Sequence, residues 1–180
     1  MARITVNETG KHPLILLSTT INSNLAAANI SSANVLSVIC LQDVTITAST
    51  GVFSWADFCS LDMNKLPTPA DNEISVNVVI DPETYFGAGT GNTAGDKGLA
   101  GLSQDKTPVQ FLVVWNYDEV VANVTGGGVT NNANVGSNVA WSSGEGFITS
   151  LAPTASPEAP VWVTPMTIAV NGTMYNGFTT

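Results

Sequence analysis

Residues with chemically reactive side chains are few and widely spaced in this 180-residue chain. The single histidine, His12, stands beside Pro13 with no cluster of nucleophiles or carboxylates near it, which disfavours a role as a general base. Cys40 and Cys59, together with one histidine, are too few ligands for a structural zinc site. The sequence also lacks the Gly-x-Ser-x-Gly turn that presents a nucleophilic serine. These observations predict that the protein is not an enzyme.

The glycine-rich segment Gly87–Gly98 has the composition of a phosphate-binding loop but not its context. Residues Gly89–Ala94 match the spacing of the dinucleotide fingerprint, which needs a parallel β-α-β unit that the sequence does not predict. A P-loop is excluded because Asp96 interrupts the required Gly-Lys-Ser/Thr, and its carboxylate would repel phosphate. The calcium-binding pattern Asp-x-Asp-x-Asp-Gly is also missing. We interpret the segment as a flexible loop and expect neither a cofactor nor a metal ion.

The length and the charge balance describe an acidic single domain covering residues 1–180. Charged residues make up 11% of the chain, less than half of the roughly 25% that is usual in soluble domains. Five basic residues against fourteen acidic ones give a net charge of −9, and nothing beyond Lys106 is basic. Electrostatic binding of nucleic acid or of an anionic membrane is disfavoured, because both require a basic patch.

The N-terminal residues indicate synthesis and folding in a cytoplasm. The apolar run Pro13–Leu17 is too short for the hydrophobic region of a signal peptide, and no run is long enough to span a membrane. In that compartment Cys40 and Cys59 are expected to be reduced packing residues. A disulfide between them is the alternative, if the mature protein meets an oxidising exterior.

Alternating or β-branched hydrophobic runs dominate the chain and predict strands. The clearest alternation is in Glu73–Asp81, whereas Val109–Trp115 is apolar almost throughout, as in a strand covered on both faces. The long run Val35–Thr50 predicts either one arm of an extended hairpin or two strands that bend near Gln42–Asp43. The predicted strands are Arg3–Asn7, Pro13–Thr19, Val35–Thr50, Glu73–Asp81, Val109–Asn116, Asn138–Ser142, Gly146–Leu151 and Pro160–Val170.

Helical signals are few, so the sequence predicts a mainly β protein. Asp96 is placed to cap one short helix through Leu99–Gln104. The predicted fold is a two-sheet sandwich or barrel with this one short flanking helix. Proline and glycine separate the strands, notably at Pro67-Thr-Pro69. Two long loops, Pro82–Lys106 and Thr125–Ser137, are expected to make assembly contacts, since loops of that length in a compact domain are usually functional or ordered by a partner.

Four stretches in the middle of the chain carry a family resemblance. The chain resembles the major tail tube proteins of long, non-contractile-tailed (siphovirus-type) bacteriophages, and is most similar to those of phages that infect actinobacteria. The match lies in the order of these stretches and in their general residue pattern, and it covers about a third to a half of the chain. The stretches are Asp43–Ala48 with Phe58–Leu61, Asn72–Asp81, Asp96–Thr107 and Val109–Trp115.

This resemblance implies a structural virion protein without enzymatic activity or cofactor. Copies would form hexameric rings that stack into a hollow tail tube, in which hairpin strands from all subunits join into one inner β-barrel. The genome would pass through this tube into the host as transient, unbound cargo. Other partners would be the tape-measure protein, tail-terminator or adaptor proteins and tail-tip proteins, and the location would be the virion tail.

Four acidic residues are our candidates for the wall of the channel. DNA carries one negative charge per roughly 1.7 Å of helix axis, so an acidic wall would let it pass without adhesion. The candidates lie on or beside the two stretches assigned to the inner barrel, and they are Asp43, Asp71, Glu73 and Asp81. The alternative is that these acids only solubilise the outer surface.

Two other classes of protein remain open at this stage. One is a different virion part, such as a capsid decoration protein or a fibre domain. The other is a carbohydrate-binding β-sandwich, in which tryptophans would stack on sugar rings. The tryptophans available for stacking are Trp55, Trp115, Trp141 and Trp162.

Overall fold

The computed structural model describes residues 11–26, 30, 35–38, 41–56, 63–118, 139–154 and 161–179. Cys40 and Cys59, the predicted strand at residues 3–7 and the predicted loop at residues 125–137 lie outside these ranges. Within them, no helix is long and apolar enough to cross a membrane.

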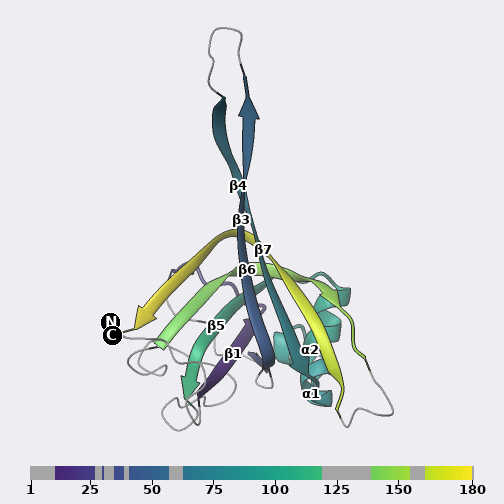
Figure 1. Cartoon of the computed structure of the whole chain (residues 1–180). Helices are drawn as coiled ribbons and strands as arrows, with labels where there is room; N and C mark the ends of the chain where they lie inside the picture. The colour runs from purple at the N-terminus through teal and green to yellow at the C-terminus, as the bar shows by residue number, and fades with distance from the viewer. Residues whose placement is uncertain are drawn as a thin grey trace.

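Seven strands of the described chain form one antiparallel sheet in the order β2-β1-β5-β6-β7-β4-β3 (Figure 1). Every neighbouring pair in this sheet is antiparallel. The prediction of a mainly β fold is therefore confirmed. The strands are β1 Lys11–Ser18, β2 Leu36–Val38, β3 Leu41–Trp55, β4 Asn64–Val79, β5 Val109–Asp118, β6 Val139–Leu151 and β7 Val163–Thr179.

The sheet is strongly curled, as the chain connection between its edges requires. β2 and β3 lie at opposite edges, yet only residues 39 and 40 separate them in the sequence. Consecutive Cα atoms are about 3.8 Å apart, so the Cα atoms of Val38 and Leu41, three residues apart, lie within about 11 Å of each other. Edge strands of a flat seven-stranded sheet would stand roughly 29 Å apart. The sheet therefore bends into an open, barrel-like shape.

The main hydrophobic core fills the inside of this curled sheet. It contains buried side chains from six strands and, on β3, the partly buried Val44 and Ile46. Leu99 and Leu102 of the helix α2 (Ala94–Gln104) close the core, and both are almost fully buried. The largest contribution from a single side chain is that of Phe111 on β5, which has no exposed surface.

A second hydrophobic cluster covers the other face of β1, β5 and β6. Leu14, Leu16, Leu112 and Val114 point into it, and residues from the segment between β1 and β2 lie over them, including Ile30. Alternate residues of β5 thus enter different cores, which explains why this strand is apolar almost throughout. The prediction that Val109–Trp115 is covered on both faces is confirmed.

The region Pro82–Lys106, predicted as a long loop with one short helix through Leu99–Gln104, holds two helices, α1 (Pro82–Phe86) and α2. The predicted helix is confirmed as part of α2, whereas α1 was not predicted. The predicted cap was also misplaced: Thr93 caps α2, and Asp96 is its partner in a capping box. The Asp96 carboxylate fills the space beside Gly89 and Gly91, so the glycine-rich turn encloses an acidic side chain. That arrangement leaves no anion cradle in the turn.

β4 begins before its predicted start at Glu73 and β3 continues beyond its predicted end at Thr50, and the two strands form an extended hairpin that projects from the body of the protein (Figure 1). The Val35–Thr50 run is divided between β2 and β3, and β3 forms one arm of the hairpin. The predicted division near Gln42–Asp43 is wrong, because these residues lie within β3. Pro67 and Pro69 were predicted to end strands but lie within β4. Proline is tolerated there because this part of β4 has β3 on one side and no strand on the other.

Candidate functional site

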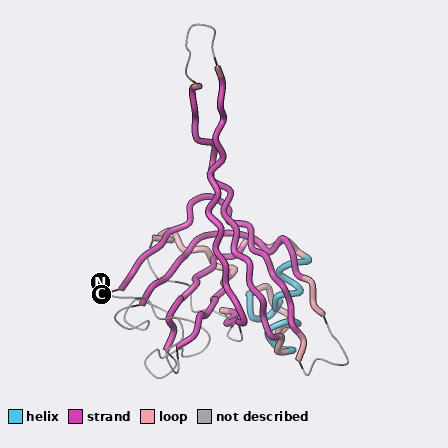
Figure 2. The backbone as a smooth tube through the Cα atoms, in the orientation of Figure 1, coloured by secondary structure: helices cyan, strands magenta, loops and turns pink. Residues whose placement is uncertain are grey.

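The projecting hairpin has bare backbone edges. β4 pairs with β7 only from Glu73 to Val79, whereas its pairing with β3 continues outward as far as Asn64 and Trp55. The outer part of the hairpin is thus a two-stranded ribbon (Figure 2). Among the described strands, β3 has no partner other than β4. Such edges present unpaired N–H and C=O groups that can pair with another chain.

The inner part of the hairpin has one apolar and one polar face. Ile46 and Ile74 are register partners on the face that enters the core. The opposite, open face carries polar residues from Asp43 to Ser49 on β3 and from Asp71 to Asn77 on β4, and two of its carboxylates are held by neighbours. Asn77 donates to Asp43 over 2.6 Å, and the Ser75 hydroxyl donates to Glu73 over 2.9 Å. The open-face residues of β3 and β4 are Asp43, Thr45, Thr47, Ser49, Asp71, Glu73, Ser75 and Asn77.

Three of the four candidate channel acids lie together on this open face. Asp43, Asp71 and Glu73 are all exposed, and register places them opposite Asn77, Ser49 and Thr47. The fourth acid has a different position. Asp81 follows the end of β4 and caps α1, its carboxylate accepting from the Thr84 backbone N–H over 3.1 Å.

A further acid of the open face was missed in the sequence. Glu145 on β6 is the register partner of Asn171 on β7, whose amide donates to it over 3.5 Å. Only the pairing of β6 with β7 shows that Glu145 extends the same acidic surface. Lys65 is the sole lysine or arginine in β3, β4, β6 and β7, and it lies on the outer part of the hairpin. The open face is therefore negatively charged.

The four tryptophans do not form a joint surface for stacking on sugars. Trp141 is buried in the second cluster, and Trp115 packs against the main core while its indole donates to Ser142 over 3.1 Å. Trp55 and Trp162 are exposed, but they lie at opposite ends of β4. This arrangement gives no support to the carbohydrate-binding alternative.

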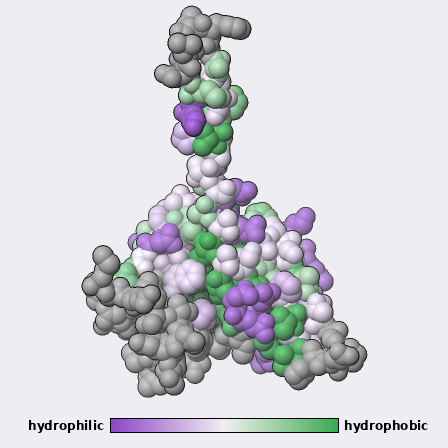
Figure 3. All heavy atoms as spheres, viewed as in Figure 1, coloured by the Kyte–Doolittle hydropathy of each residue, from purple (hydrophilic) through white to green (hydrophobic). Residues whose placement is uncertain are grey.

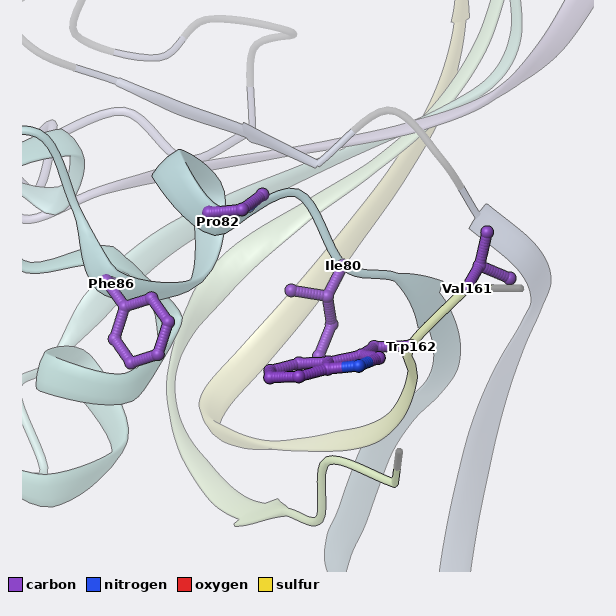
Figure 4. Close-up of a pocket in the computed structure, with 5 residues that line it drawn as sticks. All are labelled: Ile80, Pro82, Phe86, Val161 and Trp162. Atoms are coloured by element: carbon purple, nitrogen blue, oxygen red, sulfur yellow. The ribbon is translucent and has the colours of Figure 1, made fainter. Parts of the chain in front are cut away.

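The end of the domain opposite the hairpin carries an apolar cavity of about 340 Å³. Trp162 lies beside Ile80 in it, and the backbone N–H of Ile80 donates to the Trp162 carbonyl over 2.9 Å (Figure 4). The lining residues are Ile80, Pro82, Phe86, Val161 and Trp162.

The outer part of the hairpin is also apolar. Phe53 and Trp55 stack there with ring centroids 5.8 Å apart, and both side chains are exposed. Figure 3 shows hydrophobic residues on the projecting hairpin next to hydrophilic ones. Hydrophobic side chains are therefore exposed at both ends of the molecule.

The described residues contain no group of three or more His, Cys, Asp or Glu side chains that could hold a metal ion. The acids of the open face are instead spread along the strands, and three of them, Asp43, Glu73 and Glu145, accept hydrogen bonds from amide or hydroxyl groups. The chemistry that this surface offers is electrostatic repulsion of anions, together with backbone pairing along its edges.

Comparison with known proteins gives similarity in structure only. No protein-family model and no curated protein sequence matches the chain. A chain from the virion of a native gene transfer agent particle is 12% identical, with a TM-score of 0.53 over 95% of this chain and 98% of that one. A chain from the tail of an empty gene transfer agent particle, refined with C6 symmetry, is 14% identical, with a TM-score of 0.51 over 89% and 100%.

The third similar structure is the tube-terminating cap of the anti-feeding prophage. It is 12% identical, with a TM-score of 0.51 over 99% of this chain and 95% of that one. The chain thus has a fold found in tail assemblies. At these identities the likeness concerns the fold.

Proposed function

We propose that the protein is the structural subunit of a virion tail tube, without catalytic activity. Copies assemble through their strand edges into hexameric rings, which stack into a hollow tube through which the genome passes. The observation that carries the proposal is the extended β3–β4 hairpin, which combines bare edges with an acidic open face. The similar fold of a tail refined with C6 symmetry supports six copies in a ring.

The strand edges suggest how neighbouring copies join. β3 has a bare outer edge, and the pairing of β6 with β5 ends at Gly146, which leaves Phe147–Leu151 with β7 on one side. We assign these two edges to each other across the subunit boundary, so that the unit β6-β7-β4-β3 repeats around a closed barrel. Closing the sheet between copies removes the exposed edges.

The width of such a barrel agrees with a channel for duplex DNA. Each copy contributes four strands, with neighbouring strands about 4.8 Å apart and tilted by about 40°. Six copies then give a barrel with a backbone diameter of roughly 50 Å. Side chains on the inner wall reduce this width but leave room for a duplex.

The acidic open face faces the channel in this arrangement, with the apolar core behind it. Asp43, Asp71, Glu73 and Glu145 repel the phosphate backbone, so the duplex slides without forming lasting contacts. Asp81 lies at the end of the strand and belongs to the rim of the subunit instead of the wall. The wall needs no bound cofactor to act in this way.

The type of tail and the other proteins of the tail are assigned from the sequence resemblance. The tube belongs to a long, non-contractile tail of the kind found in actinobacterial phages, and it is built in the host cytoplasm. A tape-measure protein occupies it during assembly, while terminator or adaptor proteins and tip proteins close its ends.

Negative-stain and cryo-electron microscopy of the purified protein test the proposal. The expected result is rings or tubes with six-fold symmetry and a central channel. A stable trimer, or binding to capsid shells without any tube, would instead assign the protein to another part of the virion.

A further inference from the structure

We propose that Asn171 is a site of spontaneous chemical modification, at which the side-chain amide becomes a carboxylate without the help of an enzyme. The nucleophile is the backbone nitrogen of the next residue, Gly172, and the only other reactant is water. The reaction itself does not depend on assembly. Its consequence for the channel wall rests on the proposed function.

The reaction conserves all atoms and needs no oxidant or reductant. The Gly172 nitrogen attacks Cγ of Asn171, and a bond between these atoms forms while the bond from Cγ to Nδ2 breaks. Ammonia leaves with the proton of the Gly172 N–H, so a cyclic imide remains. Water then adds to one of the two imide carbonyls, and the bond from that carbonyl to nitrogen breaks. The product is aspartate or isoaspartate at position 171, and its carboxyl proton passes to the ammonia.

A glycine after the asparagine favours this attack. Glycine has no Cβ that would block the approach of its nitrogen to the preceding side chain. The nucleophile and its target belong to adjacent residues, so no encounter between molecules is needed. The chain contains two Asn-Gly pairs, at 171–172 and at 176–177, and both lie on β7. The structure gives these two pairs different surroundings.

The pair at 171–172 lies in a bulge of β7. One residue of β6, Gly144, stands there opposite three residues of β7, at positions 172–174. On the other side, β4 pairs with β7 only as far as Ala169. Asn171 and Gly172 are both exposed, and a Cβ placed on Gly172 would have no atom beyond its chain neighbours within 4 Å. The backbone of this pair therefore has room for its nitrogen to approach the asparagine side chain.

The pair at 176–177 is held in the sheet and serves as an internal reference. Asn176 and Gly177 are consecutive register partners of Ser142 and Trp141 on β6. The Asn176 side-chain oxygen accepts from the Ser142 hydroxyl over 2.7 Å, and a Cβ on Gly177 would overlap the Trp141 indole. Attack by the Gly177 nitrogen first has to break these contacts. We expect the pair at 171–172 to react about tenfold faster, which corresponds to about 1.4 kcal/mol of activation free energy.

The modified residue lies on the open face. Asn171 is two positions beyond Ala169, the register partner of Glu73, so it shares the face of that acid. Its amide donates to Glu145 over 3.5 Å, and this exposed hydrogen bond engages only Nδ2. After conversion, two carboxylates stand where a donor met an acceptor. Each copy then adds one negative charge to the channel wall, and the change is one-way because ammonia is lost to the solvent.

Incubation of the folded wild-type protein in water labelled with heavy oxygen tests the site directly. Chymotrypsin cleaves after Tyr175 and so separates the two Asn-Gly pairs for mass spectrometry. We expect the peptide with position 171 to gain a labelled carboxylate about tenfold faster than the peptide with position 176. In urea-unfolded protein the two rates should become similar, because both pairs lose their folded surroundings. Equal rates in the folded protein, or a faster reaction at position 176, would overturn the proposal.

Two variants identify the reacting groups. Asn171→Gln keeps an amide but lengthens the side chain, so the cyclic imide forms less readily and no new acidic species is expected at this position. Gly172→Ala adds a Cβ and is expected to slow the conversion by about tenfold. Ion-exchange chromatography follows the acidic species. An unchanged rate in both variants would show that the new charge arises elsewhere in the chain and would contradict the proposal.

Assembled tubes separate this inference from the proposed function. Tubes are expected to convert Asn171 as fast as free subunits do, because the open face is in contact with water in the channel. Protection of Asn171 in the tubes would contradict its place on the channel wall. Wild-type protein that forms no tube at all would refute the proposed function, while conversion in the free subunit would still support the modification site.

Discussion

Gly98 of α2 packs against Gly87 at the end of α1 so closely that a Cβ on Gly98 would overlap the backbone nitrogen of Gly87. Both glycines have positive φ angles, 62° and 82°, which side chains disfavour. Next to this contact, the Ala88 backbone N–H donates to the Gly95 carbonyl over 3.0 Å. The two helices are therefore joined backbone to backbone, and this joint holds Phe86 of the cavity in place beside the core helix.

Gly98→Ala is expected to lower the free energy of unfolding by about 2–4 kcal/mol, from backbone strain and steric overlap together. Gly172→Ala is the matched control, because Gly172 also has a positive φ of 85° but has no other atom within 4 Å of the added methyl. It should cost only about 1–2 kcal/mol. Urea denaturation of both variants measures the difference, and equal losses would show that overlap with Gly87 contributes nothing.

Gly144→Ala is expected to destabilise the protein by about 1–3 kcal/mol through overpacking. The added methyl would stand 2.7 Å from the ring of Phe111, which is fully buried. Phe111→Leu makes room, so the double variant should be more stable than the sum of the two single losses predicts, by about 0.5 kcal/mol or more. Strict additivity in thermal denaturation would argue against this contact.

Removing the charge of Asp43 should leave the subunit folded. Its carboxylate is exposed and accepts one hydrogen bond from Asn77, and exposed hydrogen bonds contribute little to stability. Asp43→Asn is expected to change the free energy of unfolding by less than about 1 kcal/mol. A larger loss in chemical denaturation would mean that this acid has a structural role, which would complicate tests of channel charge.

The charge of the open face is expected to control genome delivery. Replacing Asp43, Asp71 and Glu73 with Lys should slow delivery, because a basic wall holds DNA by counterion release. The neutral set Asp43→Asn, Asp71→Asn and Glu73→Gln is the matched control and should have an intermediate effect. Delivery by normally assembled particles, measured at two salt concentrations, is the readout, since salt should relieve the delay of the lysine variant.

Asp81→Lys, added to the variant with lysine at positions 43, 71 and 73, should remove the cap of α1. It should not slow genome delivery further. The cap of α1 depends on the Asp81 carboxylate, and losing such a cap costs about 1 kcal/mol. If the wild type, the neutral variant and the lysine variant of the open face all deliver the genome equally well, the open face lies outside the channel.

The sequence predicted the β class and the cores better than the sheet order. Alternation in Glu73–Asp81 and the apolar run at Val109–Trp115 predicted which faces are buried, because side chains alternate strictly along a strand. The pairing of β1 with β5 and of β4 with β7 joins segments more than eighty positions apart, such as Leu17 with Phe111. No local pattern encodes such partners.

The candidate site was predicted in part for the same reason. Asp71 and Glu73 are two residues apart and so share a face, but the register that adds Asp43 and Glu145 depends on pairing between strands. Asp81 lies off the open face and caps α1, and Asp-Pro at residues 81–82 is a readable signal for a cap followed by the first residue of a helix. The cavity had no sequence signal, because Ile80 and Trp162 meet only where β4 ends and β7 begins.

The separation of β2 and β3 to opposite edges of the sheet has a consequence for folding speed. Neighbours in the sequence do not pair there, so the sheet can close only after several loops of great length have closed. The β3–β4 hairpin is local and can form within about 1–10 μs, whereas sheets with such distant pairings fold over milliseconds to seconds. A newly made chain therefore displays its hairpin aromatics before its core is complete, and at a high concentration of new chains these surfaces can contact one another during that interval.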